Sequence, residues 1–507
     1  MRLRAAVFAV CTILFAVVFS AARRPPVLDL GQQLDQIRLF GEVLAGEHPE
    51  LRVTWLGSNK LGYLPLGVAS LVAPVEWLPR VALLLVAACW LAAVHAIGAW
   101  LGRPVAASVL ASTLLLGCVF YAGMFNFLLG VVSLAYWVRE LREERRDRPI
   151  VRVYFSTLGG IALAYLAHGL WLLAGGFAVA TYSLLVHFRP HETLARALAV
   201  ATFQPLAFAW ANQLEASGWQ TSSKMILAPL GRLADPDTAA SIAYGGLRGP
   251  IEPLLLSLLL LWIALGLWRA AREDWRGVDR FLAIFGGLCL AGCLLLPDKV
   301  DRTILFAWRW GAPGLLALLF AVPPPLAPRR LAAGIAGAAL LLQLGVSFFA
   351  WRDFGRREMA GFEESLAAIP PEARLLALDW RLESPNFRLA PYFQMLAWAA
   401  LERGAGTHFS FVDYPSSLVV RREPAVAYLR SDHLALNPRA LQPELLRGVT
   451  HMLVHGPPGV ARAYEEQSDI LRVAAGRADW HLLAVRRAEL ERLLAARSAA
   501  IATQPRP

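Results

Sequence analysis

The chain has 507 residues, of which 57% are hydrophobic and only 17% are charged. This leaves too little polar surface to cover a soluble globule of that size, so lipid must be the solvent for most of the chain. The formal net charge of +11 does not indicate a nucleic-acid partner, because the arginines stand mainly in short loops between apolar runs, where topology alone places them.

The first apolar run covers residues 5–22 and is preceded by Arg2 and Arg4. Basic residues before such a run predict a membrane span whose N-terminus is cytoplasmic. A cleavable signal peptide is the alternative, because the small residues at 20–22 would suit a signal peptidase. In either case, residue 23 onward is expected outside the cytoplasm.

An external loop, residues 23–63, follows the first span. Between residues 30 and 41 its apolar side chains recur at helical spacing, which predicts an amphipathic, interfacial helix lying on the membrane surface. Asp29 stands at the N-terminal end of this helix, where a carboxylate is an ordinary helix cap. The next segment, 61–75, is broken by proline and glycine and is expected to be re-entrant or interfacial.

Ten further apolar runs are about as long as a helix needs to cross a bilayer. They cover residues 81–101, 104–120, 124–138, 153–168, 170–187, 193–212, 251–268, 281–296, 305–322 and 331–350. With the first run they predict a polytopic helical domain, residues 1–350, of about eleven spans. Threading from a cytoplasmic N-terminus puts the arginine-rich loops on the cytoplasmic side and residues 351–507 on the exterior, which is the periplasm of a bacterium.

The C-terminal part, residues 351–507, alternates apolar runs of strand length with helical patterns. The expected strands cover 373–380, 450–455, 470–474 and 480–485, and the expected helices cover 392–403, 443–448 and 461–467. This order predicts a periplasmic α/β domain large enough for its own core.

Polar residues at the expected outer ends of the spans are candidates for a site. His168 could bind substrate, assist proton transfer or hold a divalent metal together with carboxylates, or it could be a satisfied interfacial histidine. Asn126 could donate to a substrate hydroxyl or cap the helix that begins there. His48 could approach the same site or be a solvated loop residue. Asp35 could join the site or pair with Arg38 one helical turn away.

The order of these features resembles the GT-C superfamily of membrane glycosyltransferases: one span, an acidic residue just outside it, an interfacial helix, many further spans and a periplasmic α/β tail. Segments 121–130 (YAGMFNFLLG), 166–169 (LAHG), 296–298 (LPD) and 308–310 (WRW) resemble segments of bacterial membrane proteins related to that superfamily. The resemblance implies a GT-C-like fold in the bacterial inner membrane. It puts Asp29 where the catalytic acid of the family stands, although the paired acidic residues of many relatives are missing here.

By resemblance, such enzymes transfer a hexosyl or pentosyl group from a polyprenyl-phosphate donor to a lipid, glycan or protein acceptor of the cell envelope. The reaction needs a base for the acceptor hydroxyl, which the resemblance makes Asp29, and a cation beside the departing phosphate. Lys60, Arg302 and Arg309 are the candidates for the phosphate, and a guanidinium suits it best because it can donate two parallel hydrogen bonds. A divalent metal is left open as a cofactor, and no metal ligand is assigned.

Other interpretations stay open at this point. Arg302 and Arg309 could pair with Asp298 and Asp301 as anchors at helix ends. If the protein were a transporter or flippase-like protein, ionisable residues would instead be expected at the middle of the spans. A non-catalytic scaffold would depend on residues 351–507 for partner binding and would tolerate loss of the acidic residue in the first external loop.

Overall fold

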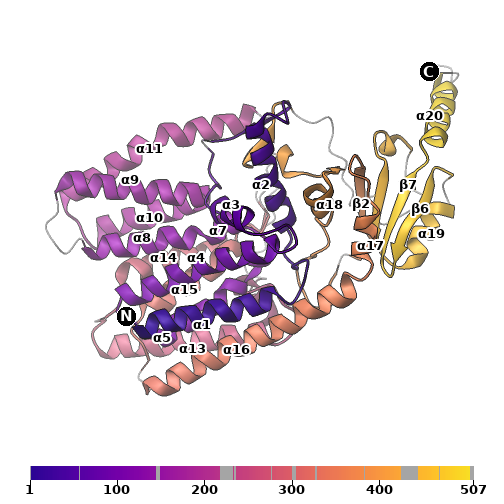
Figure 1. Ribbon diagram of the computed structural model, residues 1–507. Coiled ribbons are helices and arrows are strands. Elements are labelled where there is room, and N and C mark those ends of the chain that lie inside the picture. The colour runs from indigo at the N-terminus through magenta and orange to yellow at the C-terminus, as the bar shows by residue number, and fades with distance from the viewer. Residues whose placement is uncertain are drawn as a thin grey trace.

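The computed structural model describes residues 2–55, 57–143, 149–216, 232, 236–275, 277–299, 304–325, 328–381, 383–423, 443–466 and 469–502. Long helices lie side by side in a bundle, and a small β-sheet lies beyond one end of it (Figure 1). The N-terminus is at the end of the bundle that is remote from the sheet, and the C-terminus lies on the sheet side.

Helices occupy each range in which the sequence predicts a span. They are α1 (Arg2–Phe19), α4 (Leu78–Trp100), α5 (Val105–Ser112), α8 (Gly130–Glu143), α9 (Ile150–Ala167), α10 (Gly169–Leu185), α11 (Pro190–Ala216), α13 (Ile251–Arg272), α14 (Arg280–Leu295), α15 (Gly311–Ala321) and α16 (Arg329–Asp353). Within the described part of the chain, five of them are long and apolar enough to cross a membrane: α1, α4, α9, α13 and α16. The exact count of eleven spans stays a prediction.

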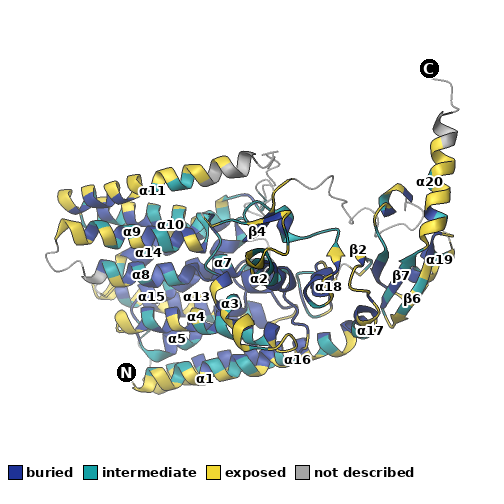
Figure 2. Ribbon diagram, turned by 45° about the horizontal axis from the view of Figure 1, so that its top comes forward, coloured by how far each residue is buried: buried dark blue, intermediate teal, exposed yellow. Residues whose placement is uncertain are grey.

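The outer faces of the bundle are apolar. Figure 2 shows exposed residues along the outside of the bundle, while its middle is buried. On α10, for example, Leu173, Phe177 and Leu185 are 68%, 62% and 78% exposed. Large apolar side chains at such exposure are unfavourable in water, whereas a lipid environment accommodates them. The surface therefore confirms the membrane character that the composition predicts.

The loops at the N-terminal end of the bundle are held together by arginines. Arg4 donates to the carbonyl of Arg103. The guanidinium of Arg103 in turn donates to the carbonyls of Phe320 (2.8 Å), Gly277 (2.9 Å) and Ala321 (2.7 Å). These loops are among those that the threading places on one side, and the structure brings them to one end. Which side of the membrane that end faces stays a prediction.

A five-stranded mixed sheet forms the C-terminal part, in the order β3-β2-β5-β7-β6. Its strands are β2 (Arg374–Asp379), β3 (Gly406–Thr407), β5 (His451–His455), β6 (Leu471–Arg477) and β7 (Trp480–Val485). All four predicted strands are confirmed. Because side chains alternate along a strand, Leu375 and Leu453 join the core shared with the bundle, while Leu376 and Val454 belong to a second, smaller core.

Short helices accompany the sheet. They are α17 (Phe362–Ala367), α18 (Leu396–Arg403), α19 (Pro458–Glu466) and α20 (Arg487–Ala502). The predicted helices at 392–403 and 461–467 correspond to α18 and α19, and the one at 443–448 is a single 3₁₀ turn, Pro443–Leu446. The last bundle helix, α16, runs into this part through a π-helical turn, Phe354–Glu358.

The first external loop and the C-terminal part are interlocked. The loop contributes β1 (Leu51–Val53), which pairs antiparallel with β4 (Val419–Arg421). Helix α2 (Leu30–Ala45) packs on α18 so closely that a Cβ on Gly31 would lie 3.0 Å from the Cβ of Ala397. The sequence predicts residues 1–350 and 351–507 as separate domains, and the structure shows that their contact is intimate at this end.

The predicted surface helix forms as α2, but its polar side does not face water. Gln32 donates to the carbonyl of Phe409 over 3.1 Å, and Gln36 accepts from the backbone N–H of Val419 over 2.8 Å. Both glutamines are buried. The C-terminal part therefore covers the start of α2, because the glutamine amides supply the hydrogen bonds that its loop backbone needs.

Candidate active site

Asp29 lies at the N-cap position of α2, yet its carboxylate makes no capping hydrogen bond. It accepts instead from Nε2 of Gln394, 2.6 Å away, which belongs to the C-terminal part. An ordinary cap would point the carboxylate at the free N–H groups of its own helix. This carboxylate is turned away from that task and is therefore available for chemistry.

The environment of Asp29 favours its protonated form. Burial raises the pKa of the Asp29 carboxyl to about 7, against smaller lowering effects from the charge of Arg309 and the hydrogen bond from Gln394. A carboxyl that titrates near neutral pH can take up a proton and release it again under working conditions. These are the properties of a general base.

The loop between α6 (Cys118–Tyr121) and α7 (Phe125–Leu128) contacts the backbone of Asp29 and holds it in position. The backbone N–H of Asp29 donates to the carbonyl of Ala122 over 3.3 Å. The next residue, Gly123, has a positive φ of 74°, and a Cβ built on it would lie 2.8 Å from the backbone nitrogen of Asp29. Glycine is required there both for the backbone conformation and for the close approach.

We expect Gly123→Ala to destabilise the protein by more than about 1 kcal/mol, because strain at positive φ and a steric clash add together. Gly102→Ala is the matched control, since Gly102 also has positive φ (64°) but has nothing within 4 Å of an added Cβ. Melting temperatures of the two purified variants check this. Equal losses in both would show that the contact with Asp29 adds nothing.

Arg309 lies in the short 3₁₀ turn Trp308–Trp310, just before α15, and is only 6% exposed. Its Nη2 donates to the carbonyl of Ile304 over 2.9 Å, and its guanidinium carbon lies 5.8 Å from the centre of the Phe127 ring. The helix-end anchor with Asp298 does not form. Asp298 instead pairs with Arg232 over 2.8 Å and accepts from Nε1 of Trp308 over 2.7 Å.

The side chains of His168 and Arg309 are in contact, and each directs a hydrogen-bond donor at the other. Nδ1 of His168 accepts from the backbone N–H of Leu170 at the start of α10, over 3.1 Å. A neutral imidazole has a single acceptor nitrogen, so the proton is on Nε2. That nitrogen lies 3.1 Å from Nη1 of Arg309, which is also a donor. In this tautomer neither group can satisfy the other, and an anionic oxygen beside them would accept from both.

Lys60 and Asn126 hold the first external loop in place. Nζ of Lys60 donates to Oγ1 of Thr54 (2.9 Å) and to the carbonyl of Ser417 (2.7 Å), and burial lowers its pKa to about 7. Oδ1 of Asn126 accepts from the backbone N–H of Gly62 over 2.6 Å instead of capping its own helix. A phosphate contact for Lys60 and a substrate hydroxyl for Asn126 stay predictions.

Two solved proteins share this architecture. ArnT from Cupriavidus metallidurans, bound to undecaprenyl phosphate, aligns with a TM-score of 0.53 at 12% identity, covering 95% of this chain and 97% of its own. Arabinofuranosyltransferase AftD from Mycobacteria aligns with a TM-score of 0.53 at 14% identity over 96% of this chain, and a mutant form of AftD with 0.51. This chain spans 40% of the AftD chain.

Both proteins are GT-C glycosyltransferases. The chain has a GT-C-like fold. No family model and no curated protein matches the sequence. At such low identity the likeness concerns the fold, so function has to be argued from the residues at the site.

Two predicted residues, Asp35 and His48, are not part of this group. Asp35 pairs with Arg38 over 2.8 Å, as the ion-pair interpretation expects. His48 contacts Glu42 (3.0 Å) and Glu50 (3.2 Å) in its loop. Arg302, and with it Asp301, lies outside the described residues. The described residues contain no group of three or more histidine, cysteine or acidic side chains that could hold a metal ion.

Two glutamines of the site escape sequence reasoning. Gln33 donates to the carbonyl of Gly123, and Gln394 donates to Asp29. The amide oxygens of both are buried without a hydrogen-bond partner among the described residues, as is Nε of Arg309. Buried polar atoms are rarely left unpaired. Three of them on residues that bond to Asp29 or act on its charge therefore indicate a site built for a polar ligand. No sequence signal links Gln394 to a residue 365 positions earlier.

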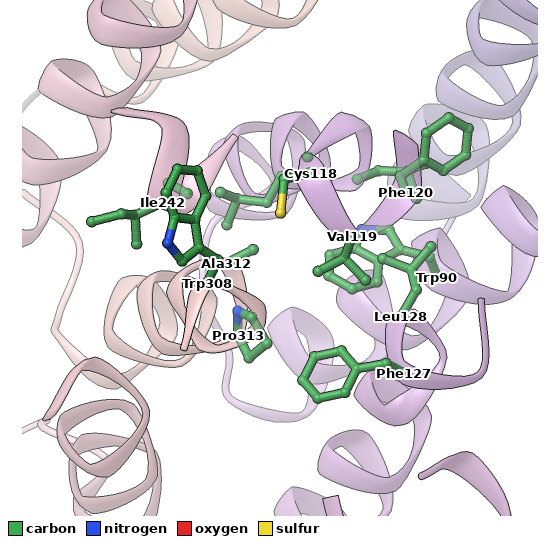
Figure 3. A pocket seen from close by; sticks show the side chains of 14 residues that line it. Trp90, Cys118, Val119, Phe120, Phe127, Leu128, Ile242, Trp308, Ala312 and Pro313 are labelled. Atoms are coloured by element: carbon green, nitrogen blue, oxygen red, sulfur yellow. The ribbon is translucent and has the colours of Figure 1, made fainter. Parts of the chain in front are cut away.

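An apolar slot lies deeper in the GT-C-like bundle, and Figure 3 shows Trp90, Val119, Phe127 and Pro313 in its lining. Phe127, whose ring lies below Arg309, forms part of one wall. The slot has a volume of about 10 Å³. This is room for one water molecule at most, so the slot is a packing gap and not a substrate site.

Proposed function

We propose that this protein is a membrane glycosyltransferase that transfers a hexosyl or pentosyl group from a polyprenyl-phosphate donor to an acceptor of the cell envelope. The donor phosphate would lie beside Arg309 and His168, and the acceptor hydroxyl beside Asp29. The N-terminus would face the cytoplasm of a bacterial inner membrane. Residues 351–507 would face the periplasm and help to bind the acceptor.

In the proposed reaction, the acceptor oxygen attacks the anomeric carbon of the sugar and its proton passes to Asp29. The bond between that carbon and the phosphate oxygen breaks, and the polyprenyl phosphate leaves with the bonding electrons. The two convergent donors, Nη1 of Arg309 and Nε2 of His168, stabilise the charge that develops on the departing oxygen. Both are fixed before the reaction begins, which is what makes such donors effective.

The observation that carries this proposal is that one small site contains both a buried carboxylate and two hydrogen-bond donors. On one side, Asp29 is a carboxylate that neither caps its helix nor forms an ion pair closer than 4 Å with a described residue. On the other, Nη1 of Arg309 and Nε2 of His168 are two donors with no acceptor between them, and Nε of Arg309 has no partner among the described residues. A hydroxyl and a phosphate are the groups that complete them.

The transfer rate should depend on pH through Asp29. The base acts as a carboxylate, so with a pKa of about 7 the rate should fall about tenfold for each pH unit below 7 and level off above it. Gln394→Leu removes a hydrogen bond that favours the carboxylate, so the midpoint should move to higher pH. Gln32→Leu breaks the hydrogen bond between α2 and the carbonyl of Phe409 in the C-terminal part, which does not involve Asp29. It should leave the midpoint in place. Rate profiles between pH 5 and 9 check this, and equal midpoints in all three proteins would contradict it.

A transfer assay tests the proposed function itself. Proteoliposomes containing the purified protein would receive undecaprenyl phosphate carrying a labelled glucose, mannose or arabinose, with an extract of bacterial envelope as acceptor. We expect label to move from at least one donor into the extract, with release of undecaprenyl phosphate. No transfer from any of the three would contradict the proposal.

The alternative functions gain no specific support. A transporter expects ionisable side chains at mid-span, but the buried carboxylates of Glu192 and Glu252 lie in the first turns of α11 and α13. A scaffold would have no need for a buried carboxylate close enough to feel the charge of Arg309.

A further inference from the structure

A second cavity lies between the bundle and the C-terminal part, and Trp308, which precedes Arg309, is among its lining residues. Its volume is about 350 Å³, within the range of about 300–1,000 Å³ that is usual for small-molecule sites. Polar lining residues come from three chain segments: Asp237, Thr238 and Ser241 from α12 (Pro236–Ala243), Arg248 from the loop that follows, and Arg388 from the C-terminal part. We call it the lateral cavity.

The walls of the lateral cavity are fixed by a buried carboxylate. Glu252, only 2% exposed, accepts from the backbone N–H groups of Gly245 (3.0 Å), Gly246 (2.8 Å) and Leu247 (2.6 Å). Arg388 then joins this loop, because its backbone N–H donates to the carbonyl of Gly246 over 3.1 Å. The loop and the C-terminal part are therefore locked together, and the cavity between them is preformed.

Each charged side chain around the lateral cavity has a partner of opposite sign. The Arg388 guanidinium forms a two-pronged ion pair with Asp237 and lies 3.4 Å from the carboxylate of Glu252. Arg248 pairs over 3.1 Å with Glu383, outside the cavity. A charged ligand would have to displace one of these partners, whereas a neutral ligand with hydroxyl groups can use the lone pairs and N–H groups that remain.

Trp308 is the aromatic residue in the lining of the lateral cavity. Its indole is held in place by the 2.7 Å hydrogen bond from its Nε1 to Asp298. A sugar ring has C–H groups on its faces and hydroxyls around its rim, so an aromatic plane with polar groups at the edge is complementary to it. Trp308 also precedes Arg309 in the same 3₁₀ turn, which puts this surface next to the proposed phosphate site.

We propose that the lateral cavity binds a neutral carbohydrate ring, held by Asp237, Arg388 and the face of Trp308. This inference rests on the proposed function, and the ring belongs either to the donor or to the acceptor. Both sources present the same hydroxyl-rich chemistry.

Binding measurements on the purified full chain separate these sources. The probes are undecaprenyl phosphate, the same lipid carrying glucose, mannose or arabinose, and the three methyl glycosides. The variant is Asp237→Asn, which keeps the side-chain volume but lowers its strength as a hydrogen-bond acceptor. Glu383→Gln is the matched control, because it weakens an ion pair of Arg248 on the surface, where Glu383 is 80% exposed.

If the cavity holds the donor sugar, at least one glycosylated lipid should bind about tenfold more tightly than undecaprenyl phosphate, and Asp237→Asn alone should remove the difference. If it holds the acceptor, one methyl glycoside should bind to the wild type and to Glu383→Gln but not to Asp237→Asn. Sugar binding that is absent, or equal in all three proteins, would overturn the inference. Failure of undecaprenyl phosphate itself to bind would instead count against the proposed function.

Discussion

Replacing Asp29 with asparagine is expected to lower the rate of sugar transfer by about 10²–10⁴-fold, the usual contribution of a general base. The substitution keeps the shape of the side chain and its contact with Gln394, but an amide cannot take up the proton of the acceptor hydroxyl. The transfer assay in proteoliposomes measures the loss. Glu42→Gln is the matched control on the same helix, because Glu42 pairs with Arg38 and His48 and should affect transfer little.

The same variant should not lose stability. Burial raises the pKa of the Asp29 carboxyl from its ordinary 3.8 to about 7 in the folded protein. The folded state therefore holds the proton more tightly than the unfolded state, and the free energy of unfolding falls as pH rises from about 4 to 7. Asparagine carries no charge that must be buried, so at pH 8 its melting temperature should equal or exceed that of the wild type. Full activity, or an inactive variant that is unfolded, would contradict the assignment.

Replacing Arg309 with alanine should reduce transfer by about 10²–10³-fold, the usual cost of removing a donor that stabilises developing negative charge. Arg309→Lys should recover part of this loss, because it keeps the charge but not the rigid two-donor fork. Transfer rates and the affinity for undecaprenyl phosphate, measured for both variants, check the expectation.

A matched control separates the local role of Arg309 from its charge. Arg421→Ala removes a guanidinium from β4, where it pairs with Asp413 over 2.7 Å. This variant should bind undecaprenyl phosphate as the wild type does. Equal losses in Arg309→Ala and Arg421→Ala would reduce the effect to general electrostatics. A tightly binding Arg309→Ala would remove this residue from the phosphate site.

The membrane topology that the sequence predicts already places three residues of the site at the same membrane face. A polar residue at the end of a span can lie at one of two membrane faces, and threading the apolar runs assigns His168 and Arg309 to the same face as Asp29. The structure brings His168 and Arg309 within 3.1 Å, and the charge of Arg309 acts on Asp29. Long-range convergence is predictable here because the bilayer reduces it to a choice of side.

The contribution of the C-terminal part could not be predicted in the same way. Gln394 reaches Asp29 because a loop packs over α2, and no periodicity encodes that contact. The glutamines at 32 and 36 lie on the polar side of the predicted amphipathic helix, yet they form hydrogen bonds with the backbone of Phe409 and Val419 in the C-terminal part. Uncharged amides on a helix that is expected at a membrane surface, where charged side chains are usual, indicate such a contact.

The central claim is that Arg309 and His168 receive a phosphate opposite Asp29. A high-resolution cryo-EM map of the protein with undecaprenyl phosphate tests it most directly. We expect phosphate density within hydrogen-bond distance of Nη1 of Arg309 and Nε2 of His168, with the carboxylate of Asp29 facing the same space. A phosphate bound elsewhere, with Arg309 and His168 still facing each other unliganded, would contradict the account.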